Sequence, residues 1–320
     1  MSRVLAFLGG HATWVLFLGV FLGLALPGLA ELARPLLAPA VAVLLTATLV
    51  RVDWQVMMMH ARRPWVTGLV TVWLLLGCPL LMTALLAFAP LPPSLFMALV
   101  LMATAPPILS AAPIALMLGL DGALAVVVGL TATLLTPLTV PPLALALLGL
   151  SLDISVTDFM LRLAAITAGS FLAAFAIRRV LGGERLSRIA GHVDGLVVVV
   201  MLIFAVAIMD GVTETLLRDP ATVGLWLLAA FVANPALQLL GTLAFCWLGR
   251  RAALTVGLVS GNCNMGLLLA AFPPGTDFDI VLYFAVAQLP MYMLPALLAP
   301  FYRRLLGPPE GAESSSIKTG

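Results

Sequence analysis

The stretch Gly257–Ala271, GLVSGNCNMGLLLAA, places two asparagines inside an otherwise apolar run. Asn262 and Asn264 lie two residues apart, between Gly261 and Gly266. On a continuous helix, side chains two residues apart point to nearly opposite sides, so one amide would face lipid unless a neighbouring helix covered it. At an interruption of the helix, both side chains and the freed carbonyls can face the protein interior. The stretch therefore predicts a broken helix with a polar site at the break.

The composition is that of an integral membrane protein. Of 320 residues, 62% are apolar and 9% are charged, whereas a soluble domain carries about 25% charged residues. The net charge of +2 is too small to indicate a nucleic-acid partner. Cys78, Cys246 and Cys263 lie in apolar segments without CxxC spacing, which indicates neither a disulfide framework nor a thiolate metal site. We expect no cofactor.

Ten segments are long and apolar enough to be membrane spans, because a membrane core about 30 Å thick requires roughly 20 residues of helix. We expect an all-α integral membrane protein with spans at about 13–31, 35–51, 65–89, 94–118, 122–150, 156–181, 191–213, 221–248, 252–271 and 277–301. Two connections are expected not to span, VDWQVMMMHARRP and RRVLGGERLSR. The tail, residues 306–320, is polar and typical of disorder.

The basic residues gather on one of the two sides that ten spans define. This side holds thirteen of the sixteen: Arg3, Arg51, Arg62, Arg63, Arg178, Arg179, Arg185, Arg188, Arg250, Arg251, Arg303, Arg304 and Lys318. The positive-inside rule places this side, with both termini, in the cytoplasm. We expect a multi-pass protein of the cell (inner) membrane.

Interruptions occur at matching places in the two halves of the chain. The fourth span carries Pro106 and Pro107 near its middle, and a proline inside a helix removes a hydrogen bond and clashes with the preceding turn. The ninth span breaks at Ser260–Asn264, about 155 residues later. Each break lies in the fourth span of a block of five, and an odd number of spans inverts the second block. We expect two inverted five-helix repeats, residues 1–150 and 151–305, as in secondary transporters.

Polar residues at membrane depth are the candidate substrate- or ion-binding residues, because such groups usually face the bundle interior. The candidates are Ser110, Asn234, Gln238, Ser260, Asn262, Cys263, Asn264 and Gln288, with Pro106, Pro107 and Gly261 forming the breaks. The alternative for each amide is an interhelical hydrogen bond that contributes about 1 kcal/mol or less. Asn234 and Gln238 are one turn apart, so they share a helix face.

Several stretches resemble the bile acid:sodium symporter family. They are LLTATLVRVDW, ARRPW, GCPLL, APPILSAAPIALMLGLDGALAVVVGLTATLLTPLTVP and SGNCNMGLLLAA. The resemblance covers nearly the whole chain and is strongest at Pro106, Asp121, Pro137, Gly261, Asn264 and Gly266. It implies a divergent bacterial-type member, with a panel domain of spans 1, 2, 6 and 7 and a core domain in which broken helices 4 and 9 cross. It also implies transport of a small organic anion, usually driven by sodium.

The chain departs from the family at the positions that bind sodium in sodium-coupled members. The family's ninth-span pattern has an acidic residue and a glutamine where this chain has Val259 and Cys263, which leaves Ser260 and Asn264. The other positions at which the family has oxygen-bearing side chains are Leu74, Ala111, Ala112, Ala125 and Gly129 here. Sodium therefore remains a candidate coupling ion, beside proton coupling and uniport.

Three functions other than organic-anion transport lead to different expectations for the sequence. An arsenite or other anion exporter of a distant branch of the family carries a cysteine in its first broken helix, where this chain has Thr104 and Ala105. A non-transporting membrane protein would show no transport. An intramembrane enzyme needs paired aspartates, an HExxH helix, or a serine and a histidine at depth. Because His11, His60 and His192 lie at span edges, we expect no enzyme. The expected partners are a small organic anion and the lipid bilayer, for a monomer or a homodimer.

Overall fold

The computed structural model describes residues 12–52, 64–149, 155–273 and 276–306, and these are helical, with no strand longer than one isolated bridge. The protein is an all-α membrane protein. In the first half, the elements are α2 (Ala12–Ala25), α3 (Pro27–Ala33), η1 (Arg34–Leu36), α4 (Leu37–Arg51), α6 (Pro64–Val72), the π-helical η2 (Trp73–Gly77), α7 (Cys78–Leu86), α8 (Pro93–Thr104), α9 (Ala111–Met117) and α10 (Gly122–Leu148). In the second half they are α11 (Val156–Ala207), α12 (Val212–Arg218), α13 (Pro220–Ala244), η4 (Cys246–Leu248), α14 (Arg250–Gly261), α15 (Met265–Ala271), α16 (Phe278–Val286) and α17 (Gln288–Leu306).

Seven helical segments among the described residues are long and apolar enough to cross a membrane. They are Pro27–Arg51, Pro64–Leu86, Gly122–Leu148, Val156–Leu186, Val193–Arg218, Pro220–Ala244 and Phe278–Leu306. The remaining expected spans coincide with α2, which has 14 residues, and with two segments that are each divided in two, α8 with α9 and α14 with α15. By their length and composition, seven such helices indicate a multi-pass membrane protein, and the count of ten stays a prediction.

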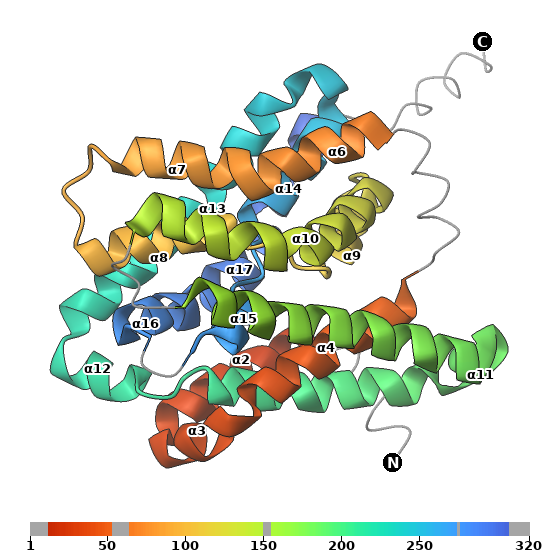
Figure 1. The fold of residues 1–320 in the computed structure, drawn as a ribbon, viewed down its shortest axis with the longest axis horizontal. Helices are drawn as coiled ribbons and strands as arrows, with labels where there is room; N and C mark the ends of the chain where they lie inside the picture. The colour runs from red at the N-terminus through yellow and green to blue at the C-terminus, as the bar shows by residue number, and fades with distance from the viewer. Residues whose placement is uncertain (1–11, 53–63, 150–154, 274–275, 307–320) are drawn as a thin grey trace, which may run out of the picture.

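The chain turns back within the connection RRVLGGERLSR, as expected of a stretch between two spans, but the residues on both sides of the turn are helical and do not form a loop. The range of α11 comprises two helices that meet at a kink at Gly182, whose φ of 69° and ψ of 165° are not helical. That φ is accessible to glycine because glycine has no Cβ. Figure 1 shows the two parts of α11 folded back on each other as a hairpin. The flanking Arg, Leu and Glu residues are good helix formers, so one glycine is enough to make the turn.

Three predictions concern residues outside those that the structure describes. The predicted tail lies outside them, apart from Leu306, which ends α17. The boundary between the two predicted repeats, at residues 150 and 151, falls in an undescribed range. The same holds for the connection VDWQVMMMHARRP, except for its first and last residues.

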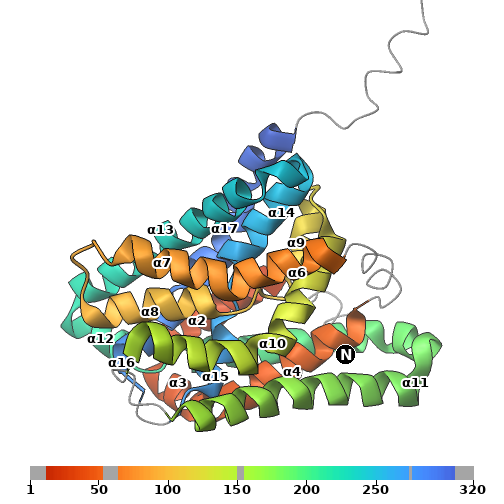
Figure 2. The ribbon, with the colours of Figure 1, turned by 45° about the horizontal axis from the view of Figure 1, so that its top comes forward.

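The helices form two groups that lie side by side (Figures 1 and 2). We call α2, α3, α4 and α11 the panel group, in which α11 packs along α4 and α2. The core group consists of α6 to α10 and α13 to α17, where α13 packs along α14, and α8 packs against α7 and α16. The two groups meet where α10 contacts α11 and where α15 contacts α4 and α11. The second part of the interrupted ninth segment therefore lies at the boundary between the groups.

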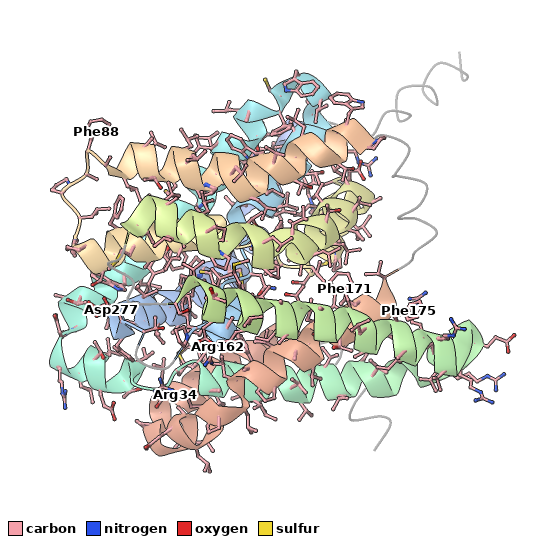
Figure 3. The ribbon with its side chains drawn as sticks, in the orientation of Figure 1. Arg34, Phe88, Arg162, Phe171, Phe175 and Asp277 are labelled. Atoms are coloured by element: carbon pink, nitrogen blue, oxygen red, sulfur yellow. The ribbon has the colours of Figure 1, made fainter. Side chains whose placement is uncertain are left out.

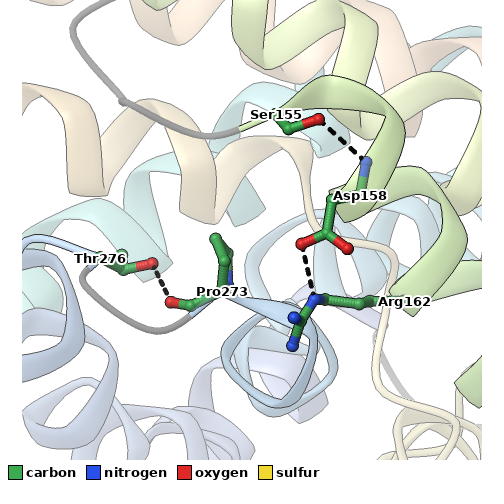
Figure 4. Close-up of polar contacts among 5 residues, drawn as sticks. All are labelled: Ser155, Asp158, Arg162, Pro273 and Thr276. Carbon is green, nitrogen blue, oxygen red and sulfur yellow. Dashed lines mark hydrogen bonds and ion pairs between the residues drawn. The ribbon is translucent and has the colours of Figure 1, made fainter.

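The start of α11 and the end of α15 form part of this boundary. Figure 4 shows Ser155, which caps α11, and Asp158 and Arg162 of α11 beside Pro273 and Thr276, in the segment that follows α15. The Asp158 N–H donates to Ser155 Oγ at 3.3 Å, and Arg162 Nε donates to Asp158 Oδ2 at 2.8 Å. The rings of Phe159 and Phe272 are in contact, with centroids 5.5 Å apart. An aromatic pair thus joins the two groups at this end.

Polar side chains start several helices, as the free N–H groups of a helix N-terminus require. The side-chain caps are Asp121 for α10, Ser155 for α11, Asp219 for α13, Asn264 for α15 and Asp277 for α16. Four of the five are aspartate or asparagine, which are among the residues preferred at this position. Four of these caps begin predicted spans, and Asn264 begins the second part of the interrupted ninth span.

Ion pairs hold α4 against α11 at both ends of α4. Arg34, the first residue of η1 before α4, pairs at 2.7 Å with Asp210, three residues after the end of α11; Arg51, the last residue of α4, pairs with Asp194 inside α11. Figure 3 shows Arg34 and Asp277 in the left half of the view, opposite the turn of α11 at the far right. Charged groups therefore mark the two ends of the helices, with apolar lengths between them.

Candidate functional site

The two interrupted segments meet at their breaks. Residues 105–110 separate α8 from α9, and residues 262–264 separate α14 from α15. Pro107 and Cys263 lie opposite each other in an antiparallel bridge. The Ile108 N–H donates to the Asn262 carbonyl at 2.8 Å, and the Asn264 N–H donates to the Pro106 carbonyl at 2.6 Å. We call residues 105–110 and 262–264 the crossing.

The prolines suit both the break and the bridge. Pro106 and Pro107 have no N–H, so they cannot continue the hydrogen bonds of α8. The bridge uses the carbonyl of Pro106 and the N–H of Ile108, and needs no donor from either proline. The same residues therefore end α8 and leave the bonding pattern of the crossing complete.

Four helix ends point at the crossing. α8 and α14 present their C-terminal ends, and α9 and α15 their N-terminal ends. A helix carries a partial negative charge at its C-terminal end and a partial positive charge at its N-terminal end. The crossing thus combines dipoles of both signs without a formal charge.

The two asparagines of the opening stretch differ in exposure and bonding. Asn262 is fully buried; its Nδ2 donates to the Leu258 carbonyl at 2.8 Å, and its Oδ1 has no hydrogen-bond partner among the described residues. Asn264 is partly exposed, and its Oδ1 accepts from the Leu267 N–H at 3.2 Å, which caps α15. Of the two, only Asn264 has exposed surface.

Ser260 links the third predicted span to the crossing. Trp73 Nε1 donates to Ser260 Oγ at 3.1 Å, and this hydroxyl donates to the Val256 carbonyl at 2.8 Å. The buried Cys263 donates through its Sγ to the Ser260 carbonyl at 3.3 Å. Trp73 begins η2, and such π-helical turns often occur at functional sites. Sequence reasoning missed Trp73, because a tryptophan in an apolar span carries no signal of its partner.

A chain of buried hydrogen bonds leads from α17 to the crossing. The Tyr302 hydroxyl donates to Gln238 Oε1, Gln238 Nε2 donates to Asn234 Oδ1 at 2.6 Å, and Asn234 Nδ2 donates to the Gly261 carbonyl at 2.9 Å. The exposed fractions are 4% for Tyr302, 5% for Gln238 and 1% for Asn234. The shared face of the two amides follows from their spacing. Tyr302 was missed, because a tyrosine beside two arginines is typical of an interfacial anchor.

Ser110 and Gln288 lie apart from this chain of hydrogen bonds. Ser110 is exposed and precedes α9 without capping it through its side chain. Gln288 is buried, and its Nε2 donates to the Phe284 carbonyl at 3.1 Å, one turn earlier. The Gln288 amide therefore bonds a backbone carbonyl close to it in the sequence and does not reach the crossing.

The interior of the described residues is polar in places but uncharged. The buried polar side chains are Thr71, Thr104, Thr133, Thr136, Thr167, Ser170, Asn234, Gln238, Thr255, Ser260, Asn262 and Gln288. Among the described residues there is also no group of three or more His, Cys, Asp or Glu that could hold a metal ion. The crossing can therefore recognise a ligand through hydrogen bonds and oriented dipoles, which act strongly in a dry interior.

No protein-family model and no curated protein matches this sequence. Pro106 and Asn264 lie at the crossing, as predicted. Gly261 and Ser260, which were predicted to be part of the break, are helical: α14 continues to Gly261, and Asn262, with φ −93° and ψ 74°, is the first residue to leave the helix.

Small residues bring α13 and α14 close together beside the crossing. A Cβ at Gly261 would lie 2.5 Å from the Asn234 carbonyl oxygen, and a Cβ at Gly257 would lie 2.5 Å from the Gln238 carbonyl oxygen. Both atoms belong to the backbone and cannot move aside. Gly257 and Gly261 have the GxxxG spacing that lets membrane helices approach closely.

Gly261→Ala is expected to lower the apparent melting temperature of the purified protein, with a loss of about 1–3 kcal/mol typical of overpacking. The matched control is Gly224→Ala on α13, where a Cβ meets nothing within 4 Å. That control is expected to be neutral or stabilising by up to about 1 kcal/mol, because alanine favours the helix more than glycine does. Equal melting temperatures for the two variants would contradict the close approach at Gly261.

Proposed function

We propose that the protein is a secondary transporter that carries a small organic anion by alternating access, as a divergent member of the bile acid:sodium symporter family. The observation that carries the proposal is the antiparallel pairing of two interrupted helices through Pro107 and Cys263. Non-helical backbone at membrane depth is tolerated only where it is buried or lines a cavity. Paired interruptions in two halves of a chain are typical of transporter binding sites.

The packing of the helices supports two inverted repeats and ten spans. In the first half, α10 packs against α6 and η2 of its own half and against α14 of the other. In the second half, α16 packs against α13 of its own half and against α8 of the other. Exchanging the halves converts one set of contacts into the other. The two strands of an antiparallel pair are related to each other by a local two-fold axis. The bridge between Pro107 and Cys263 therefore has the symmetry that two inverted repeats would give the crossing.

The distribution of charge supports an inner-membrane protein with both termini in the cytoplasm. The basic residues gather on the side predicted to be cytoplasmic, as the positive-inside rule requires. Arg51 and Arg178 belong to that side, and they are neighbours in space, since Arg178 Nη1 donates to the carbonyls of Val50 and Val52 at 2.6 and 2.8 Å. The charge pattern and the packing of α4 against α11 thus favour one topology.

We place the solute between the panel group and the core group, beside Asn264. This residue is partly exposed at the start of α15, which contacts α4 and α11. A Cβ at Gly266 would lie 3.0 Å from the ring of Phe204 of α11, so Phe204 covers the first turn of α15. The N-terminal end of a helix favours an anionic group. Sodium is one candidate coupling ion, beside proton coupling and uniport. Asn262 Oδ1, which has no hydrogen-bond partner among the described residues, is an oxygen at the crossing that a cation can use.

Thermal unfolding of the purified protein with a panel of organic anions, each in sodium, potassium and choline buffer, tests the proposal. A ligand that binds only the folded state raises the free energy of unfolding, by about 2.7 kcal/mol at one hundred times its Kd, and the melting temperature rises with it. We expect at least one anion to give a shift that depends on sodium and that Asn264→Ala abolishes. Asn264→Ser is the control, because serine also caps a helix and separates loss of the cap from loss of the amide.

The same anion is expected to accumulate in proteoliposomes that contain the wild-type protein. A shift in melting temperature that does not depend on sodium would still support a transporter of that anion, but would show that sodium is not the coupling ion. If no anion shifts the melting temperature in any buffer and none is taken up, the proposed function is wrong.

A further inference from the structure

We propose that Tyr302 is a positioning residue for the crossing. Its hydroxyl sets the orientation of the Gln238 amide, this amide sets the orientation of Asn234, and Asn234 holds the carbonyl of Gly261, the last residue of α14. The crossing begins at the next residue. A single hydroxyl near the end of α17 thereby acts on the break through two amides.

The direction of the chain follows from the groups at its ends. A carbonyl only accepts, so the Gly261 carbonyl requires the Nδ2 of Asn234. The Oδ1 of Asn234 then faces Gln238 and requires its Nε2, which turns the Oε1 of Gln238 toward Tyr302. The orientations of both amides are thus determined by their bonding. A hydroxyl is the group that completes the chain, because it donates to an oxygen that has no other described partner.

The hydrogen bond to the Gly261 carbonyl is one of several that satisfy the last carbonyls of α14. The Leu258 carbonyl accepts from the N–H and the Nδ2 of Asn262, and the Ser260 carbonyl accepts from Cys263 Sγ. The last carbonyls of a helix have no partner within the helix. With Gly261 held from α13, the following Asn262 carbonyl is presented to Ile108 across the crossing. Loss of the bond at Gly261 therefore loosens one strand of the bridge.

Tyr302 acts from a distance along the chain. It is 64 residues from Gln238 and is followed directly by Arg303 and Arg304. Removal of its hydroxyl leaves Gln238 Oε1 buried without a donor, and a buried acceptor without its donor is costly. The role of Tyr302 in positioning the crossing does not depend on the proposed function. An effect of Tyr302 on transport rests on that proposed function.

The reactivity of Cys263 measures the positioning directly. In the Cys78→Ala, Cys246→Ala background, Cys263 is the one thiol of the chain, and it is 2% exposed. We expect Tyr302→Phe to speed alkylation of Cys263 by N-ethylmaleimide about tenfold, because opening of the crossing becomes easier. The matched control is Tyr292→Phe, which removes a hydroxyl from the same helix away from this chain of bonds, and it is expected to leave the rate unchanged.

A second pair of variants separates positioning from general destabilisation. In a Gln238→Leu protein, Tyr302→Phe is expected to have no further effect on the alkylation rate, because the influence of Tyr302 passes through Gln238. An unchanged rate in Tyr302→Phe, or additive effects of Tyr302→Phe and Gln238→Leu, would overturn the proposal. Faster alkylation with undiminished uptake of the anion would retain the positioning role and contradict the placement of the transport site at the crossing.

Discussion

Asn234→Asp is expected to be folded at low pH and strongly destabilised at neutral pH, although the two side chains have nearly the same size. Asn234 is 1% exposed, accepts from Gln238 and donates to the Gly261 carbonyl at 2.9 Å. A protonated carboxyl group can make both bonds. A carboxylate has no proton for the Gly261 carbonyl and is costly to bury without a positive partner.

The size and sign of this effect follow from the proton that the aspartic acid at position 234 must keep in the folded state. An unfolded aspartate loses its proton near its ordinary pKa of about 3.9. Above that pH the folded state of the variant binds one more proton than the unfolded state, so stability falls by about 1.4 kcal/mol per pH unit. At pH 7 the loss is about 4 kcal/mol. Apparent melting temperatures of wild type and variant between pH 4.5 and 8 give this profile as the difference between the two proteins.

Asn264→Asp is the matched control, because it makes the same chemical change at the other side of the crossing. Asn264 is partly exposed and caps α15 through its Oδ1. A carboxylate caps a helix as well as an amide does, and it is favoured by the positive end of the helix dipole. We expect its stability to stay within about 1 kcal/mol of the wild type. Parallel pH profiles for the two variants would show that Asn234 does not donate to the Gly261 carbonyl.

The positions of the helices could be predicted because the membrane imposes a length on each span. The breaks could be predicted from Pro106 and Pro107 and from the two closely spaced asparagines. The pairing of Pro107 with Cys263 could not, since it joins residues far apart in the sequence and depends on backbone groups. A turn between the two parts of α11 was predicted, whereas the helical geometry around Gly182 was not, because polar residues there are typical of a loop although Arg, Leu and Glu are good helix formers.

The candidate site could be predicted only in part, because its amides stand out in an apolar sequence and its aromatic residues do not. An amide at membrane depth is conspicuous in the sequence, so Asn234, Gln238 and Asn264 were identified as candidates. Their partners Trp73 and Tyr302 are aromatic residues of a kind that also serve as packing residues and interfacial anchors. Only the folded chain shows that each of them donates a hydrogen bond to the network around the crossing.

A link between the panel group and the core group is expected to stop transport, whereas a link inside the crossing is expected to spare it. For the first link, Phe159→Cys and Phe272→Cys replace rings whose centroids lie 5.5 Å apart, on α11 and just after α15. For the second, Pro107→Cys places a thiol opposite Cys263. Residues opposite each other in a pair of this bonding pattern have Cα atoms about 4.5 Å apart, a distance that accommodates a disulfide.

The comparison is made in proteins that contain no other cysteine. Cys78→Ala and Cys246→Ala are present in both, and Cys263→Ala is added for the link between the groups. The first link uses a short cleavable bifunctional thiol reagent, and the second uses mild oxidation. Ile108→Cys is the control for the second link, because neighbouring residues of an extended strand point to opposite faces. We expect it to give far less disulfide than Pro107→Cys.

The two links distinguish rigid movement of the core group from movement within the crossing. If the core group rocks as one body against the panel group, both sides of the crossing travel together, and a disulfide between them leaves uptake of the anion intact. The link from α11 to the end of α15 fixes the two bodies, so uptake is lost and returns when a reductant cleaves the link. The reverse result, in which the disulfide at Pro107 stops uptake and the link between the groups does not, would mean that the two breaks slide past each other during transport.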